Sequence, residues 1–495
     1  MTELGSGVSG RPTGRPPAGI GSAFGRPERA ELPQLSVASS AKGRLDLLRW
    51  PLLGRALRSR WPQLLLRLAA LAGFVVAVLA GLIGTPVGNH NIGIVLVWIA
   101  WWTIMMLVAL PFFGRGWCSI CPIPMPGEWL QHGAFLTPRR NGAGLKKAWP
   151  ARFKNIWLQN AAFSAVAVCS AVVLTQPRTT AVVLLAFLFV AIGTSLIYER
   201  RTFCRYLCPV GGFIGLYSQL APVAIRVKNK ATCAAHTEKS CFRGNADGAG
   251  CPWMLYPGTL AKNTYCGMCM ECVRTCPHDN IAVTLRPFGA DLQASAGRRL
   301  DEAFKGFIML GAAIVYSAVM LGPWGDLKMA AYDIGSAQWF AYALGVLVFI
   351  NGVLPGLFLG AVGAGRALVA SPLPIKRSFV AFAYSLVPLG LMAWIAFSLS
   401  FVFASISYLW PTMSDPFGVG WNLFGTAHAG WQPYLTRSVP TLQVLVLVAG
   451  FAWSAVTARR IAAEELGQRA ALLQAAPVIG YCLLITVCLL GLLIA

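Results

Sequence analysis

The sequence predicts an all-α, polytopic membrane protein with a small cysteine-rich α+β domain inserted between its apolar segments. Of its 495 residues, 56% are hydrophobic and only 12% are charged, which is outside the usual range of soluble globular domains. Apolar runs of about 18 to 25 residues recur along the chain, and each could cross a bilayer core about 30 Å thick as a helix. The composition therefore excludes a soluble protein.

Nine of these runs are predicted to be transmembrane helices. They begin near Leu64, Ile92, Ile156, Ala181, Gly306, Trp339, Phe379, Pro440 and Pro477. The run from Phe379 to Trp410 is too long for one upright helix, so we expect it to tilt or to extend beyond the bilayer. The spans form a four-helix membrane part over residues 64–222 and a five-helix membrane part over residues 301–495. The cysteine-rich domain, residues 223–300, lies between them.

The distribution of Lys and Arg predicts the orientation of these helices, because cytoplasmic loops hold the excess of basic residues. With the N-terminus inside, only Arg178, Lys328 and Arg437 of the 41 basic residues fall in outside loops. This arrangement accounts for most of the formal net charge of +23 and argues against nucleic-acid binding. We therefore expect a bacterial-type inner (cytoplasmic) membrane protein with a cytoplasmic cysteine-rich domain and its C-terminus outside. Residues 1–63 are predicted to be a disordered basic cytoplasmic tail and a pre-membrane segment.

Most of the 14 cysteines fall in segments predicted to be cytoplasmic, where thiols stay reduced and structural disulfides are rare. The tightest pattern is Cys266-x2-Cys269-x2-Cys272-x3-Cys276-Pro277, which matches the bacterial ferredoxin run C-x2-C-x2-C-x3-C-P. Zinc sites usually pair two C-x2-C knuckles a dozen or more residues apart, so this spacing fits zinc poorly. We therefore expect residues 223–300 to form a bacterial ferredoxin-like domain with two [4Fe–4S] clusters.

The first cluster needs a second Cys-Pro, because the fourth cysteine of such a run binds the other cluster in two-cluster ferredoxins. Cys251-Pro252 lies 15 residues upstream of Cys266. The predicted ligands of the first cluster are Cys266, Cys269, Cys272 and Cys251.

The second cluster has only three cysteines available, namely Cys276, Cys233 and Cys241. Cys233-x2-His236 has the spacing of a C-x2-C pair with an imidazole in the second place, and imidazole binds iron in Rieske centres. His236 is therefore the candidate fourth ligand. The alternatives are that His236 is an exposed loop histidine, or that this cluster lacks one protein ligand.

Two further Cys-Pro motifs form an internal repeat at the ends of apolar hairpins. They are Cys118-x2-Cys121-Pro122 and Cys204-x3-Cys208-Pro209. Both are preceded by an aromatic residue, Arg, a second aromatic residue and then Cys, as in Phe113-Gly114-Arg115-Gly116-Trp117-Cys118 and Tyr198-Glu199-Arg200-Arg201-Thr202-Phe203-Cys204. Two equivalent hairpins could bring four thiols together at the membrane edge. These thiols could bind a further metal centre, act as a dithiol relay or mark structural turns.

With these motifs the chain resembles the membrane polyferredoxin family that includes NapH and NosR. The resemblance rests on the segment from Phe203 to Gly211, on the run from Cys266 to Pro277 and on the alternation of hairpins with Cys-Pro motifs. It covers roughly residues 64–290. It implies a protein that passes electrons across or along the membrane to partner redox proteins.

The rest of the chain has few candidate sites. The last five predicted spans hold no ionisable side chain in their interiors, which argues against ion pumping. The loop from Pro411 to Val439 contains His428, a candidate for an outside quinone or partner site, although its aromatic residues are also typical of an interfacial belt. We find no catalytic constellation beyond the clusters, so we expect an electron-transfer component of an oxidoreductase complex rather than a stand-alone enzyme.

These features predict an iron–sulfur protein that relays electrons between a cytoplasmic redox partner and the quinone pool or a membrane redox subunit. The cytoplasmic partner would be an acidic ferredoxin, a flavodoxin or a dehydrogenase, attracted by a basic surface. The residues of that surface are Lys228, Lys230, Lys239, Arg243, Lys262 and Arg274. The alternative is an assembly or maturation factor that delivers electrons or metal to a partner oxidoreductase.

Overall fold

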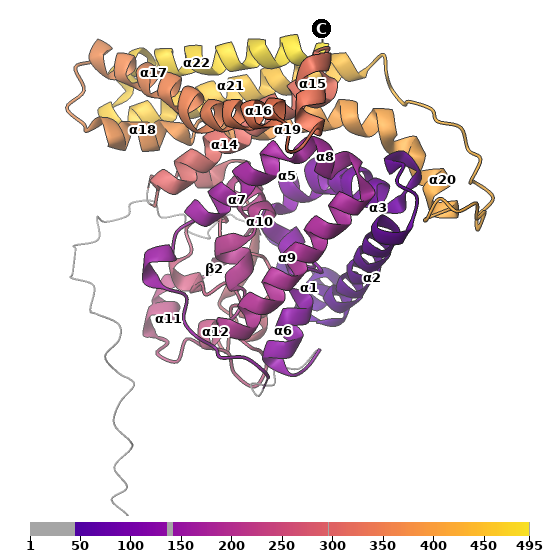
Figure 1. Ribbon diagram of the computed structural model, residues 1–495. Coiled ribbons are helices and arrows are strands. Elements are labelled where there is room, and N and C mark those ends of the chain that lie inside the picture. Colours follow the sequence, from indigo (N-terminus) through magenta and orange to yellow (C-terminus); the bar gives the residue numbers. More distant parts are fainter. Residues whose placement is uncertain (1–44, 136–141, 296, 495) are drawn as a thin grey trace, which may run out of the picture. The chain divides into compact units, whose positions relative to one another are not determined.

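The computed structural model of the chain describes residues 45–135, 142–295 and 297–494 (Figure 1). Most of the tail predicted over residues 1–63 lies outside these residues. Its last part, however, is folded: it forms strand β1 (Leu45–Asp46) and helix α1 (Pro51–Arg58), followed by helix α2 from Trp61. Residues 43–495 form one compact unit.

Eight helices among the described residues are long and apolar enough to cross a membrane. They are Trp61–Ile83, Ile92–Ser119, Pro177–Ile197, Leu300–Leu321, Ala337–Leu368, Ile375–Ser414, Val439–Leu466 and Gln468–Ile494. Only 22% of the apolar window of the first of them is buried inside the protein, so its remaining apolar side chains need a lipid environment. These helices indicate a multi-pass membrane protein.

The span predicted to begin near Ile156 is not one continuous helix. It consists of α7 (Trp157–Val168) and α8 (Ser170–Thr175), which are separated at Cys169. Each is shorter than a bilayer core requires. A ninth span is therefore still a prediction.

The span predicted from Gly306 begins six residues earlier, because α14 starts at Leu300 (α14, Leu300–Tyr316). The first turns of this helix carry Asp301, Glu302 and Lys305, and all three side chains are buried. The hydropathy pattern ends the span at these charged residues, whereas the helix continues through them because their side chains are enclosed by neighbouring segments. These three residues lie at the start of the span Leu300–Leu321, and its interior from Gly306 onward holds no Lys, Arg, Asp or Glu.

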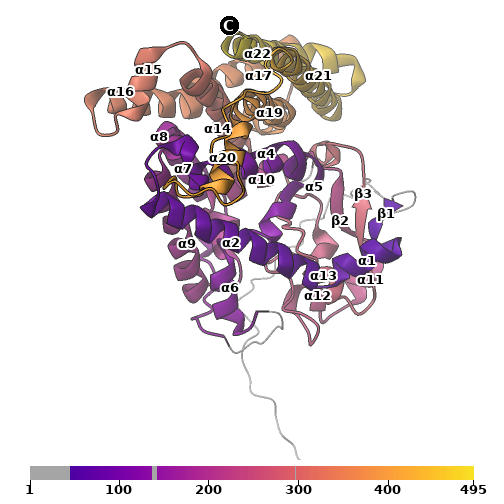
Figure 2. The ribbon, with the colours of Figure 1, turned by 90° about the vertical axis from the view of Figure 1, so that its right-hand side faces the viewer.

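Helix α14 connects the C-terminal helices with the segment of the Cys-Pro repeats (Figure 2). It contacts α19 (Leu386–Ser405) on the C-terminal side, and α7 and α10 (Pro209–Tyr217) on the other. The C-terminal helices α21 (Val439–Leu466) and α22 (Gln468–Ile494) pack mainly on each other. Part of α14 is thus placed next to the second Cys-Pro motif.

A three-stranded antiparallel sheet supports the cysteine-rich segment. Its order is β1-β3-β2, with β2 at Val223–Val227 and β3 at Ile281–Leu285, and Val223 pairs with Leu285. Buried apolar side chains of β2 and β3 pack against the run of cysteines that the two strands enclose. The two paired strands β2 and β3 therefore precede and follow this segment in the chain.

Candidate metal centres

The structure brings the four cysteines of the two Cys-Pro repeats together. Cys118 lies in the 3-10 turn Gly114–Ser119, Cys204 lies in the π-helical turn Phe203–Leu207, and Cys208 caps α10. Burial raises the pKa of Cys204 well above its usual value, and charges on Cys208, Cys121 and Cys118 act in the same direction. We call Cys118, Cys121, Cys204 and Cys208 the membrane-edge quartet.

Two buried arginines hold the repeats to each other. Arg115 donates a hydrogen bond of 2.9 Å to the carbonyl oxygen of Cys204, and Arg201 donates one to the carbonyl oxygen of Cys118. Both arginines are only 2% exposed. The arginine of each repeat therefore binds the backbone of the other repeat at its first cysteine.

Glu128 on α6 (Met125–His132) neutralises Arg201. Its carboxylate accepts two hydrogen bonds from the Arg201 guanidinium and lies 3.6 Å from Arg67. Burial alone would raise the pKa of Glu128, but Arg201 and Arg67 outweigh it and lower this pKa to about 2. Glu128 is therefore ionised at neutral pH, and sequence reasoning missed it because no spacing rule connects it to the cysteines.

A second group of thiols contains the predicted ligands of the first cluster. Burial raises the pKa of Cys266 to about 11, and a charge on Cys269 acts in the same direction. Burial also raises the pKa of Cys272 well above its usual value, and charges on Cys266, Cys269 and Cys251 act in the same direction. We call Cys251, Cys266, Cys269 and Cys272 the Cys251 quartet; the structure places these four thiols together.

A third group, the Cys233 trio, consists of Cys233, Cys241 and Cys276. Burial raises the pKa of Cys241 to about 11, and charges on Cys276 and Cys233 contribute. His236 follows α11 (Lys230–Ala235), and its ring packs edge-to-face on His278 at a centroid distance of 4.8 Å. His278 is the second residue after Cys276. The structure thus places His236 near this trio, and its role as a ligand is still a prediction.

Asn280 is a residue of this group that sequence reasoning missed. Its side-chain amide donates to the Cys233 sulfur at 3.2 Å, and its backbone N–H donates to the Cys276 sulfur at 3.4 Å. Similar backbone donors reach Cys208, from Gly211 at 3.2 Å, and Cys251, from Leu255 at 3.4 Å. An N–H group that points at a sulfur stabilises the thiolate form that binds iron.

Trp253 lies between the Cys251 quartet and the membrane-edge quartet. Its ring is 1% exposed and is 4.3 Å from the Arg115 guanidinium carbon. On its other side, a Cβ atom added at Gly267 would lie 2.0 Å from the indole nitrogen. Toward the trio, a charge on Cys241 contributes to the raised pKa of Cys272. The three thiol groups therefore follow one another, with the Cys251 quartet in the middle.

The thiols do not converge on single ions. In the described parts of the chain, no three Cys, His, Asp or Glu side chains are placed to hold one metal ion. Cysteines that bind a cubane attach to four different irons and so stand further apart than zinc ligands.

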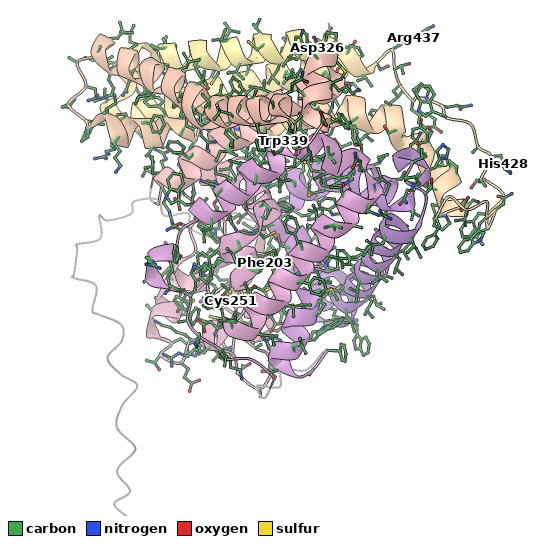
Figure 3. All side chains as sticks on the ribbon, viewed as in Figure 1. Phe203, Cys251, Asp326, Trp339, His428 and Arg437 are labelled. Carbon is green, nitrogen blue, oxygen red and sulfur yellow. The ribbon has the colours of Figure 1, made fainter. Side chains whose placement is uncertain are left out.

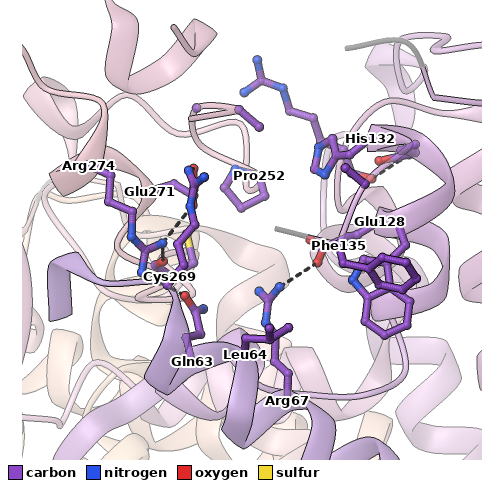
Figure 4. A pocket seen from close by; sticks show the side chains of 17 residues that line it. Gln63, Leu64, Arg67, Glu128, His132, Phe135, Pro252, Cys269, Glu271 and Arg274 are labelled. Carbon is purple, nitrogen blue, oxygen red and sulfur yellow. Dashed lines mark hydrogen bonds and ion pairs between the residues drawn. The ribbon is translucent and has the colours of Figure 1, made fainter. Parts of the chain in front are cut away.

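A polar cavity of about 100 Å³ borders the Cys251 quartet (Figure 4). Cys269 and Arg274 line one side, and His132 and Phe135 line the other. Burial lowers the pKa of His132 below its usual value, although nearby Glu128 opposes this shift. The neutral imidazole could accept a proton from a bound molecule.

Other predicted residues lie apart from the cysteines or are not exposed. His428 lies on the loop between α20 (Leu409–Ser414) and α21, away from Phe203 and Cys251 (Figure 3). The basic surface is smaller than predicted, because Lys262 is 8% exposed and donates to the Gly297 carbonyl. Arg274 is also enclosed, since it binds Glu271 and three backbone carbonyls of residues 57–59. The exposed part consists of Lys228, Lys230, Lys239 and Arg243.

The Cys-Pro repeats match a known family of protein domains. A family model described as a 4Fe-4S binding domain matches residues 94–140 and 180–228, and each segment contains one repeat. YccM of Escherichia coli (strain K12), named as a candidate electron transport protein, is 30% identical over 136 residues, which are 26% of this chain and 34% of YccM. The chain thus matches about a third of the length of this relative. No solved structure matches the chain.

The multi-pass helical fold and the paired Cys-Pro segments define a class of membrane proteins with 4Fe-4S binding sequences. Both comparisons support a resemblance to membrane-associated, polyferredoxin-like 4Fe–4S proteins. The resemblance drawn from the sequence is confirmed.

Proposed function

We propose that this protein is a membrane-bound electron carrier with three iron–sulfur centres in a row. It would relay electrons between a cytoplasmic redox partner and the quinone pool or a membrane redox subunit. The observation that carries this proposal is the order of the three thiol groups, which runs from the Cys233 trio through the Cys251 quartet to the membrane-edge quartet.

The two quartets and the trio are the ligands we propose. The Cys251 quartet would hold one [4Fe–4S] cluster, and the Cys233 trio with His236 would hold the second. The membrane-edge quartet would hold a further centre, which we propose because buried hydrogen bonds hold its two repeats together. A [4Fe–4S] cluster supplies one-electron transfer at a potential set by its charge, hydrogen bonds and exposure.

The protein's own residues would protect and orient these centres. Every cysteine of the Cys251 quartet is at most 9% exposed, so water has little access to the thiols. Gly211, Leu255 and Asn280 direct N–H groups at cysteine sulfurs and would hold them in place. Trp253 fills the space between two thiol groups and excludes water from it.

The two ends of the row differ in a way that suits two different partners. The exposed residues Lys228, Lys230, Lys239 and Arg243 belong to the segment of the Cys233 trio and could attract an acidic soluble protein. The other end, the membrane-edge quartet, includes Cys118 of the candidate membrane span Ile92–Ser119 and could pass electrons to a quinone or a membrane subunit.

Electron transfer in reconstituted vesicles tests the proposal. A reduced flavodoxin would be the donor, and reduction of a quinone in the membrane would be measured. We expect the double variant Cys204→Ser/Cys208→Ser to lose this reduction while the spectra of the other clusters are retained. Cys488→Ser, at an exposed cysteine outside the three groups, is the matched control and should behave like the wild type. Full quinone reduction by the double variant would overturn the proposal.

A further inference from the structure

Lys305 on α14 takes part in none of the contacts described above. Its side chain is 0% exposed, and its ammonium group has no hydrogen-bond partner among the described residues. Burying a charged group without a partner is costly because the charge loses its hydration. A buried lysine therefore keeps its positive charge only where a negative charge lies nearby.

The two acidic residues on the same helix do not supply that charge by direct contact. Asp301 pairs with Arg299 at 2.6 Å and accepts a hydrogen bond from the Ile156 N–H at 2.9 Å. Glu302 accepts hydrogen bonds of 2.5 Å from the hydroxyls of Tyr265 and Tyr384. Both carboxylates are thus engaged by other groups.

The ammonium group lies instead against the turn that follows Cys208. A Cβ atom added at Gly212 would be 2.7 Å from the Lys305 Nζ atom. Cys208 is four residues before Gly212 and is among the charged groups that act on Lys305. On another side, Nζ is 5.8 Å from the centre of the Phe163 ring. Lys305 is therefore directed at the membrane-edge quartet.

Arg115 adds a second buried cation at the same place. Its two terminal nitrogens donate to the carbonyls of Thr264 and Cys204, and its Nε atom has no partner in the described chain. Arg115 and Lys305 line the same small cavity, which has a volume of about 10 Å³. A single water would fill this space but could not neutralise two positive charges. Glu302 also lines this cavity and balances part of the positive charge, and the adjoining thiol group would supply the rest.

We propose that Lys305, together with Arg115, supplies the positive charge that balances an iron–sulfur centre on the membrane-edge quartet and raises its reduction potential. This inference rests on the proposed function, because it requires that the quartet holds such a centre. Four thiolates give a cluster a net negative charge that increases by one unit on reduction. A fixed cation nearby therefore favours the reduced form. Lys305 would act as a positioning residue for charge without ligating the metal.

Redox titration of the purified holoprotein, followed by EPR, tests the proposal. The signal of the membrane-edge centre is identified as the one that Cys204→Ser/Cys208→Ser removes. We expect Lys305→Met to lower the ratio of reduced to oxidised centre at a fixed potential about tenfold, which equals about 59 mV for a one-electron couple. Lys262→Met is the matched control. It also removes a buried ammonium, but that ammonium binds the Gly297 carbonyl and lies over the Tyr384 ring.

Gly212→Ala provides a second variant that does not remove the lysine. The added methyl group would displace the tip of Lys305, whereas alanine is favoured over glycine inside helix α10. We expect a shift in the same direction as that of Lys305→Met but smaller. The double variant Lys305→Met/Gly212→Ala should shift the reduction potential no more than Lys305→Met does alone.

The outcomes separate this inference from the proposed function. A membrane-edge signal in the wild type whose potential is unchanged in Lys305→Met and in Gly212→Ala would overturn the role of Lys305 alone. If Lys305→Met does not fold, an unchanged potential in Gly212→Ala has the same meaning. Absence of a signal that depends on Cys204 and Cys208 would overturn both proposals.

Discussion

Arg115 donates a hydrogen bond of 2.9 Å to the carbonyl oxygen of Cys204, which lies 89 residues further along the chain. Arg201 makes the corresponding bond to the carbonyl oxygen of Cys118. Each arginine precedes the cysteine of its own repeat by three residues, so the two repeats exchange equivalent contacts. The protein scaffold thus fixes the two Cys-Pro turns relative to each other through its own hydrogen bonds.

Loss of Arg201 should destabilise the protein more than loss of the whole ion pair. Arg201→Met leaves the buried Glu128 carboxylate with the more distant Arg67 as its ion-pair partner, and breaking a buried pair on one side typically costs about 3–5 kcal/mol. The double variant Arg201→Met/Glu128→Leu removes the stranded charge and should recover part of this loss. The midpoint of chemical unfolding in detergent, followed by helical circular dichroism, measures both effects. Equal loss in the single and double variants would contradict this explanation.

Acid should weaken the same ion pair within a defined pH range. The pKa of Glu128 is lowered from 4.5 to about 2. Because the folded state has the lower pKa, the stabilisation is complete above about pH 4.5 and is lost as the pH falls through about 2. We expect the wild type to lose about 3 kcal/mol across this range relative to Glu128→Gln, which lacks the titration. Unfolding midpoints measured from pH 6 to pH 2 check this, and parallel profiles of the two proteins would show that Glu128 does not titrate in this way.

His236 and His278 can be separated by paired substitutions. Their rings touch, but only His236 has the spacing of a ligand after Cys233. We expect His236→Ala to change the EPR spectrum and lower the potential of one cluster, because an imidazole ligand raises the potential. His278→Ala should leave both unchanged. Identical spectra and potentials in the two variants would remove His236 from the ligand set.

Gly267 should not tolerate a side chain. A Cβ atom there would lie 2.0 Å from the Trp253 indole nitrogen, and overpacking of this kind typically costs about 1–3 kcal/mol. Gly267→Ala should therefore lower the unfolding midpoint and the yield of iron in the purified protein. Gly345→Ala, on α16 (Ala337–Val348), is the control because no atom lies within 4 Å of its added Cβ. Equal behaviour of the two variants would mean that Trp253 does not pack tightly against Gly267.

Local signals in the sequence were sufficient to predict most membrane spans, and they also suggested the three groups of cysteines. Apolar runs identify helices that face lipid, and the C-x2-C-x2-C-x3-C-P spacing directly describes how one segment folds around a cluster. The grouping of Cys251 with Cys266, Cys269 and Cys272 could be predicted for that reason. The repeated order of an aromatic residue, Arg, a second aromatic residue and Cys also indicated that the two hairpins were equivalent.

Contacts between distant segments could not be predicted in the same way. Glu128 and Asn280 reach their partners only through the tertiary fold, and neither belongs to a motif. Lys305 falls just before the span predicted from Gly306, because a hydropathy pattern ends at charged residues, although the helix continues through it. Lys262 was assigned to the surface because lysines are mostly exposed, and its burial depends on Tyr384, 122 residues later.

Iron analysis combined with EPR tests the central claim, that the chain carries three iron–sulfur centres. For the purified wild type we predict about twelve iron atoms per chain, four for each [4Fe–4S] cluster. Cys204→Ser/Cys208→Ser should lower this to about eight and remove one EPR signal while the others persist. A wild type with about eight iron atoms, and a double variant with the same iron content and spectrum, would contradict the account.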